Sequence, residues 1–348
     1  MYLSELRLTN FRNLEHAQLD GEPGIHWLYG ENGAGKTSVL ESLYVLARGR
    51  SFRSNNIHHL VRDGAPQLNV FARTEAPAAR LGMARSRSGW AGKINGEATH
   101  RVSEFAKRLP VVLVEPTHHE LIEGGPDRRR AFMDWGMFHV KHGYLSTTRR
   151  YNRYLQQRNA ALKQRAPNAT LDALEAPMAE LANAVDEART HYVDRLVGHT
   201  QQLQLDLDWR FAAIDLRYSR AEPVDYGQIW RAQRDRDREL GYTREGTHRA
   251  DLKIVANGRL AAPRLSRGQQ KLTALLLLLG QLLVAQEAER LPLLLLDDPV
   301  SELDQAHLER ILAWVQCLPN QVWITAVAPP PHTVAQLFHV KHGAITPG

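Results

Sequence analysis

The stretch from Gly30 to Thr37 constrains the fold of this 348-residue chain more than any other. It reads Gly-Glu-Asn-Gly-Ala-Gly-Lys-Thr and matches the pattern G-x-x-x-x-G-K-[ST] at every fixed position. An apolar run, Ile25 to Tyr29, precedes it, and a helical stretch, Ser38 to Ala47, follows it. A strand, a glycine-rich turn and a helix in this order present backbone N–H groups to phosphates. The sequence therefore predicts an α/β domain that holds a nucleotide.

Every residue of this phosphate loop is a candidate contact to the nucleotide, and two side chains have specific expected roles. Lys36 is expected to reach the β- and γ-phosphates, and the Thr37 hydroxyl is expected to ligate Mg²⁺. An ordinary glycine turn is the alternative, which further motifs must exclude. The candidates in the loop are Gly30, Glu31, Asn32, Gly33, Ala34, Gly35, Lys36 and Thr37.

A second constraint lies far downstream, where the apolar run Leu293 to Leu296 is followed directly by Asp297 and Asp298. A buried central strand of a parallel sheet has this pattern, and it delivers acids to the carboxyl edge where nucleotides bind. Asp297 suits Mg²⁺ coordination, and Asp298 could orient or deprotonate the attacking water. By itself the run is as typical of a purely structural strand as of a nucleotide-binding one. Together with the phosphate loop it indicates a Walker B element.

The segment from Leu265 to Lys271 comes directly before a long apolar helix. Ser266 suits an N-cap and Gly268 allows close backbone approach, so the segment could be only a helix start. In the functional interpretation it is an ABC-type signature, whose serine and helix N-terminal amides face the γ-phosphate of a nucleotide held by another subunit. Ser301 to Asp304 then resembles the D-loop that follows Walker B in the same ATPases. Four elements in the correct order form a specific combination.

The order of the motifs and the long insertion between them resemble the SMC/Rad50/RecF branch of ABC-type ATPases. The likeness is closest to the RecF family and runs from the first residues to near the last. The segments that carry it are Leu6–Leu14, Gly49–Ser54, Gly124–Asp134, Gln157–Leu162, His248–Leu252 and Ser266–Lys271.

This resemblance implies a DNA-repair ATPase with an ABC-type head and a short helical arm. It implies binding of ATP and Mg²⁺, ATP-dependent dimerisation, DNA binding, and work with RecO and RecR to place RecA at gaps. It adds Arg12, Ser266, Gly268 and Gln269 to the expected nucleotide contacts. Lys36, Ser266 and Asp298 become the expected catalytic residues.

Composition limits the class of protein further. Cys317 is the one cysteine, so an internal disulfide is impossible and a reducing compartment is natural. Met1 to Leu8 alternates like a strand and lacks the pattern of a signal peptide. The most apolar stretch, Leu272 to Ala285, is broken by polar residues and too short to span a bilayer, so we expect a buried helix. We therefore expect a soluble, cytoplasmic protein without a membrane partner.

Basic and acidic residues segregate in the middle of the chain. The net charge of +6 permits nucleic-acid binding without proving it. Residues 128–165 hold ten Lys/Arg and one acid, whereas residues 171–202 hold six acids and two arginines. Both segments have helical apolar spacing, and Pro167 separates them. The pattern predicts an antiparallel helical hairpin with a basic and an acidic limb, and with Pro177 in the first turn of the second helix.

The basic excess has two interpretations. Either it steers the pairing of the hairpin limbs or is simply solvated, or it forms a track for DNA phosphates with salt-sensitive contacts that do not read sequence. We see no zinc finger, helix-turn-helix spacing or RNA-binding aromatic motif, so we do not expect base-specific readout. The basic limb has no aromatic stacking platform, which favours duplex DNA over single strands. The candidates for DNA binding are Arg128, Arg129, Arg130, Arg149, Arg150 and Arg153.

Two smaller features carry less weight. The hexapeptide Phe138–Gly143 recurs letter for letter at Phe338–Gly343. Its two histidines could serve as metal ligands, but no third ligand is evident, so we interpret the repeat as coincidence without function. Arg231 to Glu239 has nearly alternating charges and is typical of an exposed helix rather than a DNA site.

The fold expectation follows from the motifs. Residues 1–114 and 240–348 should close into one ATPase head, because the Lys36 and Asp297 elements must meet around a single nucleotide. Residues 115–239 should form a helical arm domain between them. The early part of the head should contain a mixed sheet with antiparallel strands, and the later part a parallel sheet flanked by helices.

The expected mechanism has two heads that close around ATP, so that Ser266 of one completes the γ-phosphate site of the other. Closure grips DNA, and hydrolysis aided by Asp298 releases it. Because most ABC ATPases carry Glu where this chain has Asp298, we expect slow hydrolysis. No switch histidine follows Gln321–Thr325, since His332 is displaced, and no clear Q-loop glutamine stands near Val111–Glu115.

Other functions share part of the pattern. A non-hydrolysing, ATP-dependent DNA clamp would bind ATP without turnover. A transporter-type ABC ATPase subunit would need a Q-loop coupling surface and membrane partners. A phosphate-loop kinase would lack the signature segment, and its activity would ignore DNA.

Overall fold

The computed structural model describes residues 1–330 and 334–348, so His332 lies outside the described residues. The chain divides into two compact units, Met1–His118 with Ala285–Gly348, and His119–Val284. The second unit is therefore inserted in sequence between the two parts of the first. The predicted division differs, because it assigns residues 240–284 to the ATPase head. Residues 240–284 include the signature segment, which we expect to contact a nucleotide held by another subunit. Their assignment to the ATPase head therefore stays a prediction.

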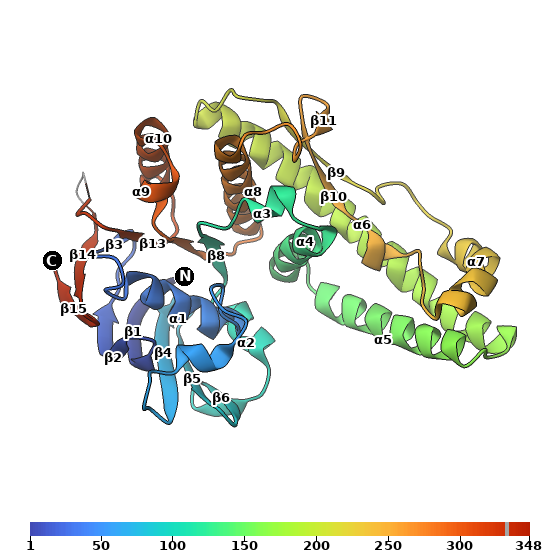
Figure 1. Cartoon of the computed structure of the whole chain (residues 1–348), viewed down its shortest axis with the longest axis horizontal. Helices are drawn as coiled ribbons and strands as arrows, with labels where there is room; N and C mark the ends of the chain where they lie inside the picture. Colours follow the sequence, from blue (N-terminus) through green and yellow to red (C-terminus); the bar gives the residue numbers. More distant parts are fainter. Residues whose placement is uncertain (331–333) are drawn as a thin grey trace. The chain divides into compact units, whose positions relative to one another are not determined.

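The first unit contains an antiparallel sheet with the strand order β2-β1-β4-β5-β6-β7 (Figure 1). Its inward side chains alternate with exposed ones along each strand, as a sheet with one solvated face requires. The strands are β1 (Tyr2–Phe11), β2 (Leu14–Asp20), β4 (Gln67–Glu75), β5 (Ala79–Ser86), β6 (Gly89–Ile94) and β7 (Glu97–Thr99).

A second sheet in this unit has the order β15-β14-β3-β13-β12-β8 and unites strands from both ends of the chain. All its neighbouring strands are parallel except β14 and β15. The four leucines of β12 are all buried, as expected for a central parallel strand. The strands are β3 (Ile25–Tyr29), β8 (Val111–Val114), β12 (Leu293–Leu296), β13 (Val322–Ala326), β14 (Gln336–Lys341) and β15 (Ala344–Pro347).

Helix α1 (Lys36–Arg48) links the two sheets through one hydrophobic core. Its buried Val39 and Leu43 pack in the same cluster as Leu6 of β1 and Leu295 of β12. Apolar side chains on both sheets therefore fix the helix that follows the phosphate loop. The shorter helices of this unit are η1 (Ile57–Leu60), α2 (Val102–Arg108), α9 (Pro299–Glu302) and α10 (Gln305–Gln316).

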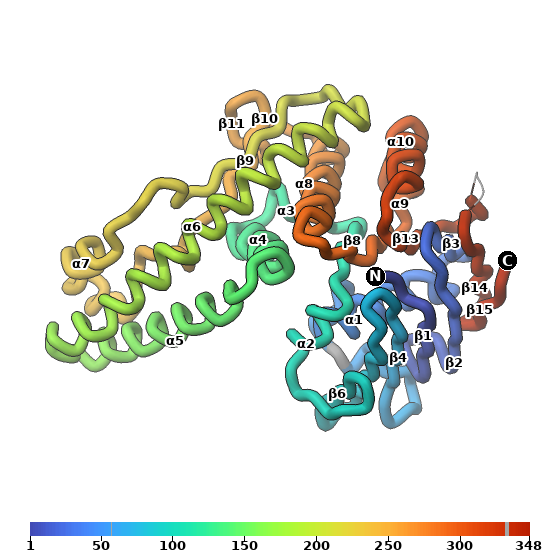
Figure 2. Tube along the Cα trace, turned by 180° about the vertical axis from the view of Figure 1, so that it is seen from behind, coloured from blue at the N-terminus to red at the C-terminus, as the bar shows by residue number. Residues whose placement is uncertain are grey.

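The second unit is mainly helical and contains a small antiparallel sheet with the order β11-β10-β9. Helices α5 and α6 run antiparallel, side by side, in both views (Figures 1 and 2), which confirms the predicted hairpin. The elements are α3 (Glu120–Glu123), α4 (Pro126–Val140), α5 (Tyr144–Lys163), α6 (Asn168–Asp206), β9 (Ile214–Tyr218), α7 (Tyr226–Leu240), η2 (Thr247–Arg249), β10 (Leu252–Ala256), β11 (Arg259–Leu260) and α8 (Arg267–Glu287), whose last three residues belong to the first unit.

A buried ionic cluster ties the hairpin to α7. The fully buried Arg158 on α5 donates to Glu175 of α6 at 2.9 Å and to Asp237 of α7 at 2.8 Å. Arg234 of α7 also pairs with Glu175. Buried charges are tolerated only when they are paired, so this cluster fixes the register of three helices. The segment Arg231–Glu239 is helical as predicted, but Arg234 and Asp237 are buried rather than exposed because they serve this cluster.

The expectation for Pro177 was wrong. Helix α6 begins at Asn168, so Pro177 lies inside the helix rather than in its first turn. A proline there removes one backbone hydrogen bond and costs about 3 kcal/mol. The buried Leu171, Glu175 and Met178 on both sides of it anchor α6 in the unit, and this packing offsets the loss.

Helix α8 confirms the expected burial of the apolar stretch Leu272–Ala285. Among the described residues it is the one helix whose length and composition would allow it to cross a membrane. Most of its apolar side chains are buried, including Leu275, Leu276 and Leu279. Core helices of globular units meet the same criteria, because they are surrounded by protein.

Candidate nucleotide-binding site

The phosphate loop runs from the end of β3 into α1 and depends on glycines for its path. Gly30 has a φ of +149°, and a Cβ placed there would lie 2.1 Å from the carbonyl oxygen of Val340 on β14. Gly35 has a φ of +121° and directly precedes α1. Only glycine adopts these conformations without strain, and at Gly30 the neighbouring strand leaves no space for a side chain.

Two turns hold the loop from outside. The Asn13 side chain, between β1 and β2, donates to the carbonyl oxygens of Gly33 at 3.2 Å and Ala34 at 3.0 Å. Its own carbonyl accepts from the Ser38 hydroxyl at 3.2 Å. From the turn between β14 and β15, the Gly343 N–H donates to Ala34 at 3.0 Å. The loop is therefore preorganised, since these bonds satisfy backbone groups that do not face a phosphate.

Lys36 is buried within the loop. Its Nζ donates to the carbonyl oxygens of Gly30 at 2.7 Å and Glu31 at 2.9 Å. Burial lowers the pKa of Lys36, and the nearby Asp298 and Asp297 oppose that shift. These contacts turn the ammonium group toward carbonyl oxygens of the loop, and its expected contact with the β- and γ-phosphates stays a prediction.

The phosphate loop and the predicted Walker B element meet, as the sequence requires. Strand β13 separates β3 from β12, and both outer strands end at the same edge of the parallel sheet. The Thr37 hydroxyl donates to Asp297 Oδ1 at 2.8 Å. Burial raises the pKa of Asp297, while hydrogen bonds from Thr37 and Thr325 and the charge of Arg53 lower it. Because Mg²⁺ prefers hard oxygen ligands, the hydroxyl of Thr37 and the carboxylate of Asp297 suit this ion.

Asp298 has a different environment from Asp297. Its backbone is left-handed, with φ 49° and ψ 52°, and α9 begins directly after it. Its N–H donates to Thr325 Oγ1 at 2.9 Å. The side chain lines the cavity described below, and its charge acts on Lys36. Two adjacent acids thus have separate tasks, because one is hydrogen-bonded to Thr37 and the other faces the cavity.

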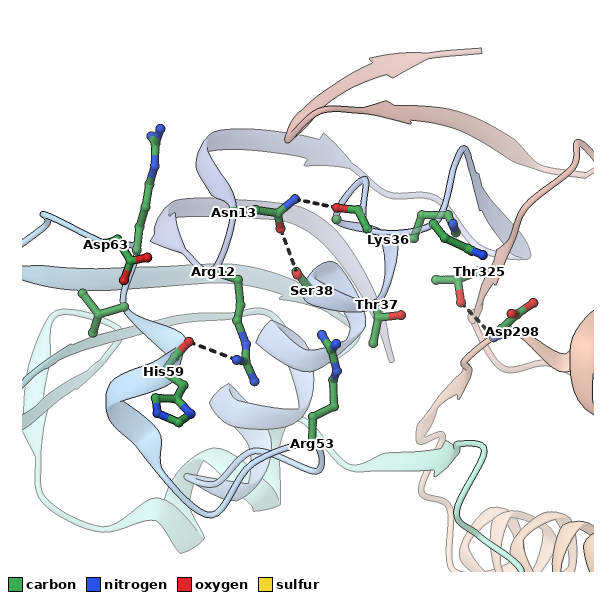
Figure 3. Close-up of a pocket in the computed structure, with 15 residues that line it drawn as sticks. Arg12, Asn13, Lys36, Thr37, Ser38, Arg53, His59, Asp63, Asp298 and Thr325 are labelled. Carbon is green, nitrogen blue, oxygen red and sulfur yellow. Dashed lines mark hydrogen bonds between the residues drawn. The ribbon is translucent and has the colours of Figure 1, made fainter.

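A cavity of about 700 Å³ joins these groups (Figure 3). This is a suitable size for a nucleotide. Lys36, Thr37 and Asp298 lie toward one end, whereas His59 and Asp63 lie toward the other. The lining residues are Arg12, Asn13, Asn32, Gly33, Gly35, Lys36, Thr37, Ser38, Arg53, His59, Val61, Arg62, Asp63, Asp298 and Thr325.

Arg12 reaches this cavity in a fixed orientation. Its guanidinium donates to both carboxylate oxygens of Glu41 on α1, at 2.9 and 2.7 Å, and to the His59 carbonyl oxygen at 3.0 Å. Glu41 is fully buried, and Arg53 lies 3.8 Å from it. A bidentate pair of this kind restricts a side chain strongly. Arg12 and Arg53 thus lie around Glu41 in the wall of the cavity, and Lys36 and Arg62 add positive charge to its lining.

Sequence reasoning did not single out Asn13, Glu41, Arg53 or Thr325, which shape this site. Asn13 and Arg53 stand inside recognised segments, Leu6–Leu14 and Gly49–Ser54, so their positions carried a usable signal. Glu41 and Thr325 carried none, because a charged residue in a helix and a threonine in a strand are ordinary features of a sequence.

The signature segment lies in the second unit and begins α8. The Ser266 hydroxyl accepts from the Gln269 N–H at 3.3 Å, and the Gln269 side chain accepts from the Ser266 N–H at 3.0 Å. This reciprocal pair is a capping box, so the helix-start interpretation holds locally. Ser266, Arg267 and Gly268 are exposed, which leaves them accessible to another molecule. Their expected contact with a second subunit's nucleotide stays a prediction.

The six candidate DNA-binding arginines fall into two groups. Arg129 donates to both carboxylate oxygens of Asp251, at 2.8 and 2.9 Å. Arg130 donates to the Ala250 carbonyl oxygen at 2.7 Å, and Arg128 pairs with Glu120. By contrast, Arg149, Arg150 and Arg153 are exposed on α5, and no ion pair with them is found within residues 1–330 and 334–348.

Comparisons with known proteins extend over the whole chain. The family described as "RecF/RecN/SMC N terminal domain" matches residues 2–342. The chain is 37% identical over 360 residues to the DNA replication and repair protein RecF of Stenotrophomonas maltophilia (strain R551-3), with 99% of both chains covered. It is 34% identical over 362 residues to that of Thioalkalivibrio sulfidiphilus (strain HL-EbGR7), with 100% of both covered.

Solved structures give the same result. The chain matches "Structure of the recombination mediator protein RecF-ATP in RecFOR pathway" with a TM-score of 0.86 and 26% identity, covering 99% of this chain and 97% of the other. The Smc head domain of Pyrococcus furiosus matches with a TM-score of 0.61 and 16% identity, over 100% and 96% of the two chains, which concerns the fold alone. The predicted fold class, an α/β ABC-type head with an inserted helical hairpin, is confirmed.

The packing around Gly30 leads to a test of the site. Because the added Cβ would meet a backbone oxygen, Gly30→Ala must displace the phosphate loop, and we expect the affinity for a fluorescent ATP analogue to fall about tenfold or more. Gly96→Ala is the control, since Gly96 also has a positive φ, +92°, but no atom within 4 Å of the new Cβ. The control should lose about 1 kcal/mol of stability and keep its affinity. Wild-type affinity in Gly30→Ala would contradict this account of the loop.

Proposed function

Since the chain belongs to the RecF family of DNA replication and repair proteins, we propose that it is an ATP-dependent DNA-binding protein of recombinational repair and replication restart. ATP drives two heads together around DNA, and slow hydrolysis releases the DNA. The observation that carries this proposal is the hydrogen bond between Thr37 and Asp297, which brings the two nucleotide motifs to one cavity that Asp298 also lines.

The residues around the cavity have different roles in ATP binding and hydrolysis. The backbone amides of the phosphate loop bind the phosphates, and Lys36 and Arg12 supply positive charge beside them. Thr37 and Asp297 hold Mg²⁺, which neutralises charge on the β- and γ-phosphates when it is bound. Asp298 orients the attacking water or accepts its proton. Its short side chain is consistent with slow turnover, so that hydrolysis acts as a timer.

The second half of each site comes from another copy of the chain. Ser266, Gly268 and Gln269 sit at the N-terminus of α8, whose positive dipole end favours an anion, and the Ser266–Gln269 capping box would open or share its N–H groups when a phosphate arrives. They contact the γ-phosphate held by the partner head. ATP binding therefore favours the dimer, because the ligand completes an interface that neither copy forms alone.

DNA binds through phosphate contacts without base-specific readout. Arg149, Arg150 and Arg153 carry most of this role, because Arg129 and Arg130 are committed to internal acceptors. Duplex or gapped DNA in the cytoplasm is the target. RecO and RecR are the partners in placing RecA at gaps, which the naming of the RecFOR pathway for the solved RecF relatives supports.

The transporter-type alternative is set aside, because the relatives that match this chain at 37% and 34% identity over its whole length are RecF proteins. A clamp that binds ATP without turnover differs from the proposed function in one measurable property, which is hydrolysis.

ATP turnover, measured against protein concentration with and without linear duplex DNA, tests the proposed function. We expect slow turnover that rises with protein concentration and with DNA, and that is lost in both Lys36→Ala and Ser266→Arg. Ser88→Arg, at an exposed turn, controls for the added charge and should behave as the wild type. Turnover that ignores DNA and survives Ser266→Arg would point to a monomeric enzyme. Binding of ATP with no turnover would point to a non-hydrolysing clamp.

The salt dependence of DNA binding tests the exposed arginines of α5. In the double variant Arg149→Gln/Arg153→Gln, the slope of log K against log salt should decrease by about 0.9 for each DNA phosphate that the variant no longer neutralises. The matched control is Arg231→Gln/Arg236→Gln, which removes the same charge from exposed positions of α7. An equal decrease in both double variants would show a general charge effect and contradict a track on α5.

A further inference from the structure

Thr325, near the end of β13, forms hydrogen bonds to both Walker B residues. It is fully buried, and its hydroxyl donates to Asp297 Oδ1 at 2.8 Å. The same hydroxyl accepts from the Asp298 N–H at 2.9 Å. Leu296 pairs with Ile324 in the register of β12 and β13, so Thr325 lies level with Asp297. One hydroxyl group therefore uses its donor and its acceptor on the two adjacent residues that follow β12, and Figure 3 shows the bond to Asp298.

The bond to Asp297 fixes a carboxylate that also serves the phosphate loop. Asp297 Oδ1 accepts from both Thr37 and Thr325, each at 2.8 Å. Hydrogen bonds to a charged group are stronger than those between neutral groups. Thr37 and Thr325 thereby restrict the orientation of this carboxylate from two different elements.

The bond from Asp298 holds a backbone that is otherwise unfavourable. Asp298 is left-handed, with φ 49°, and this conformation is strained for a residue other than glycine. Thr325 accepts from its N–H, and on the other side the Ser301 hydroxyl donates to its carbonyl oxygen at 3.0 Å. The peptide groups that flank Asp298 are thus fixed, and they determine where its carboxylate lies in the cavity.

Thr325 contacts one Walker B residue through that residue's carboxylate and the next through its backbone N–H, and it also lines the cavity. The residues that follow it, Ala326, Val327 and Ala328, have no side chain that could form a hydrogen bond. At this end of β13, Thr325 is therefore the residue suited to link the strand to the reacting groups.

We propose that Thr325 is a positioning residue for ATP hydrolysis, one that fixes the orientation of the Asp297 carboxylate and directs Asp298 toward the attacking water. The assignment rests on the proposed ATPase function. Its hydroxyl acts only through the Asp297 carboxylate and the Asp298 backbone, so removing it should impair turnover more than nucleotide binding. The methyl group of Thr325 is not required for this role.

Two substitutions separate the hydroxyl from the shape of the side chain. Thr325→Val keeps the shape and loses both hydrogen bonds, whereas Thr325→Ser keeps the hydroxyl. We expect kcat in Thr325→Val to fall about tenfold to a hundredfold, with KM for ATP within about threefold of the wild type. Thr325→Ser should retain most of kcat. The matched control is Thr200→Val, another buried threonine, whose hydroxyl donates to its own helix at 2.7 Å. It should leave kcat unchanged.

Amide hydrogen exchange gives a readout that needs no turnover. Without nucleotide, the Asp298 amide should exchange about tenfold faster in Thr325→Val than in the wild type or in Thr325→Ser. If the wild-type protein does not hydrolyse ATP, the proposed hydrolysis has failed, and exchange alone decides the role of Thr325. Unchanged kcat and exchange in Thr325→Val would overturn the proposal. Equal loss of kcat in the valine and serine variants would also overturn it, because the hydroxyl would then not be responsible.

Discussion

The hydrogen bond between Thr37 and Asp297 joins residues 260 positions apart in the sequence, and the organisation of the first unit depends on it. The bond is possible because β3, from the start of the chain, pairs with β13 and β14 from its end. A chain that folded as two consecutive domains would separate the phosphate loop from its carboxylates. The second unit therefore has to be an insertion in the sequence, and the nucleotide site requires both ends of the chain.

The segments outside the phosphate loop that carry the resemblance to the RecF family have two different physical roles. Some serve the cavity directly, as Arg12 and Arg53 do. Others hold the second unit together through ion pairs, such as the buried pair of Arg158 with Glu175 and the half-buried pair of Arg189 with Asp134. Motifs of a family thus mark structural pairs as well as functional groups. A sequence cannot distinguish the two cases, because the partner residue lies elsewhere in the chain.

Local patterns predicted the strand Ile25–Tyr29, the helical hairpin and the buried stretch Leu272–Ala285, since each depends on apolar spacing. Tertiary packing decided the rest. The hexapeptide Phe138–Gly143 ends a helix and enters a turn, whereas its copy Phe338–Gly343 forms a strand and a turn. The same six residues therefore adopt different structures because their surroundings in the fold differ. Pro177 inside α6 and the fully buried Glu41 follow the same rule, because long-range contacts outweigh their local preferences.

The central claim is that each nucleotide is served by the phosphate loop of one copy and the signature segment of another. Mixing two inactive variants tests it most directly. Lys36→Ala inactivates the phosphate loop of its own copy, and Ser266→Arg inactivates the signature segment of its own copy. A mixed dimer therefore keeps one intact composite site, formed by the loop of the Ser266→Arg copy and the signature segment of the Lys36→Ala copy. Random pairing of equal amounts should restore turnover to about a quarter of the wild-type value. A mixture as inactive as either variant alone would contradict a shared site.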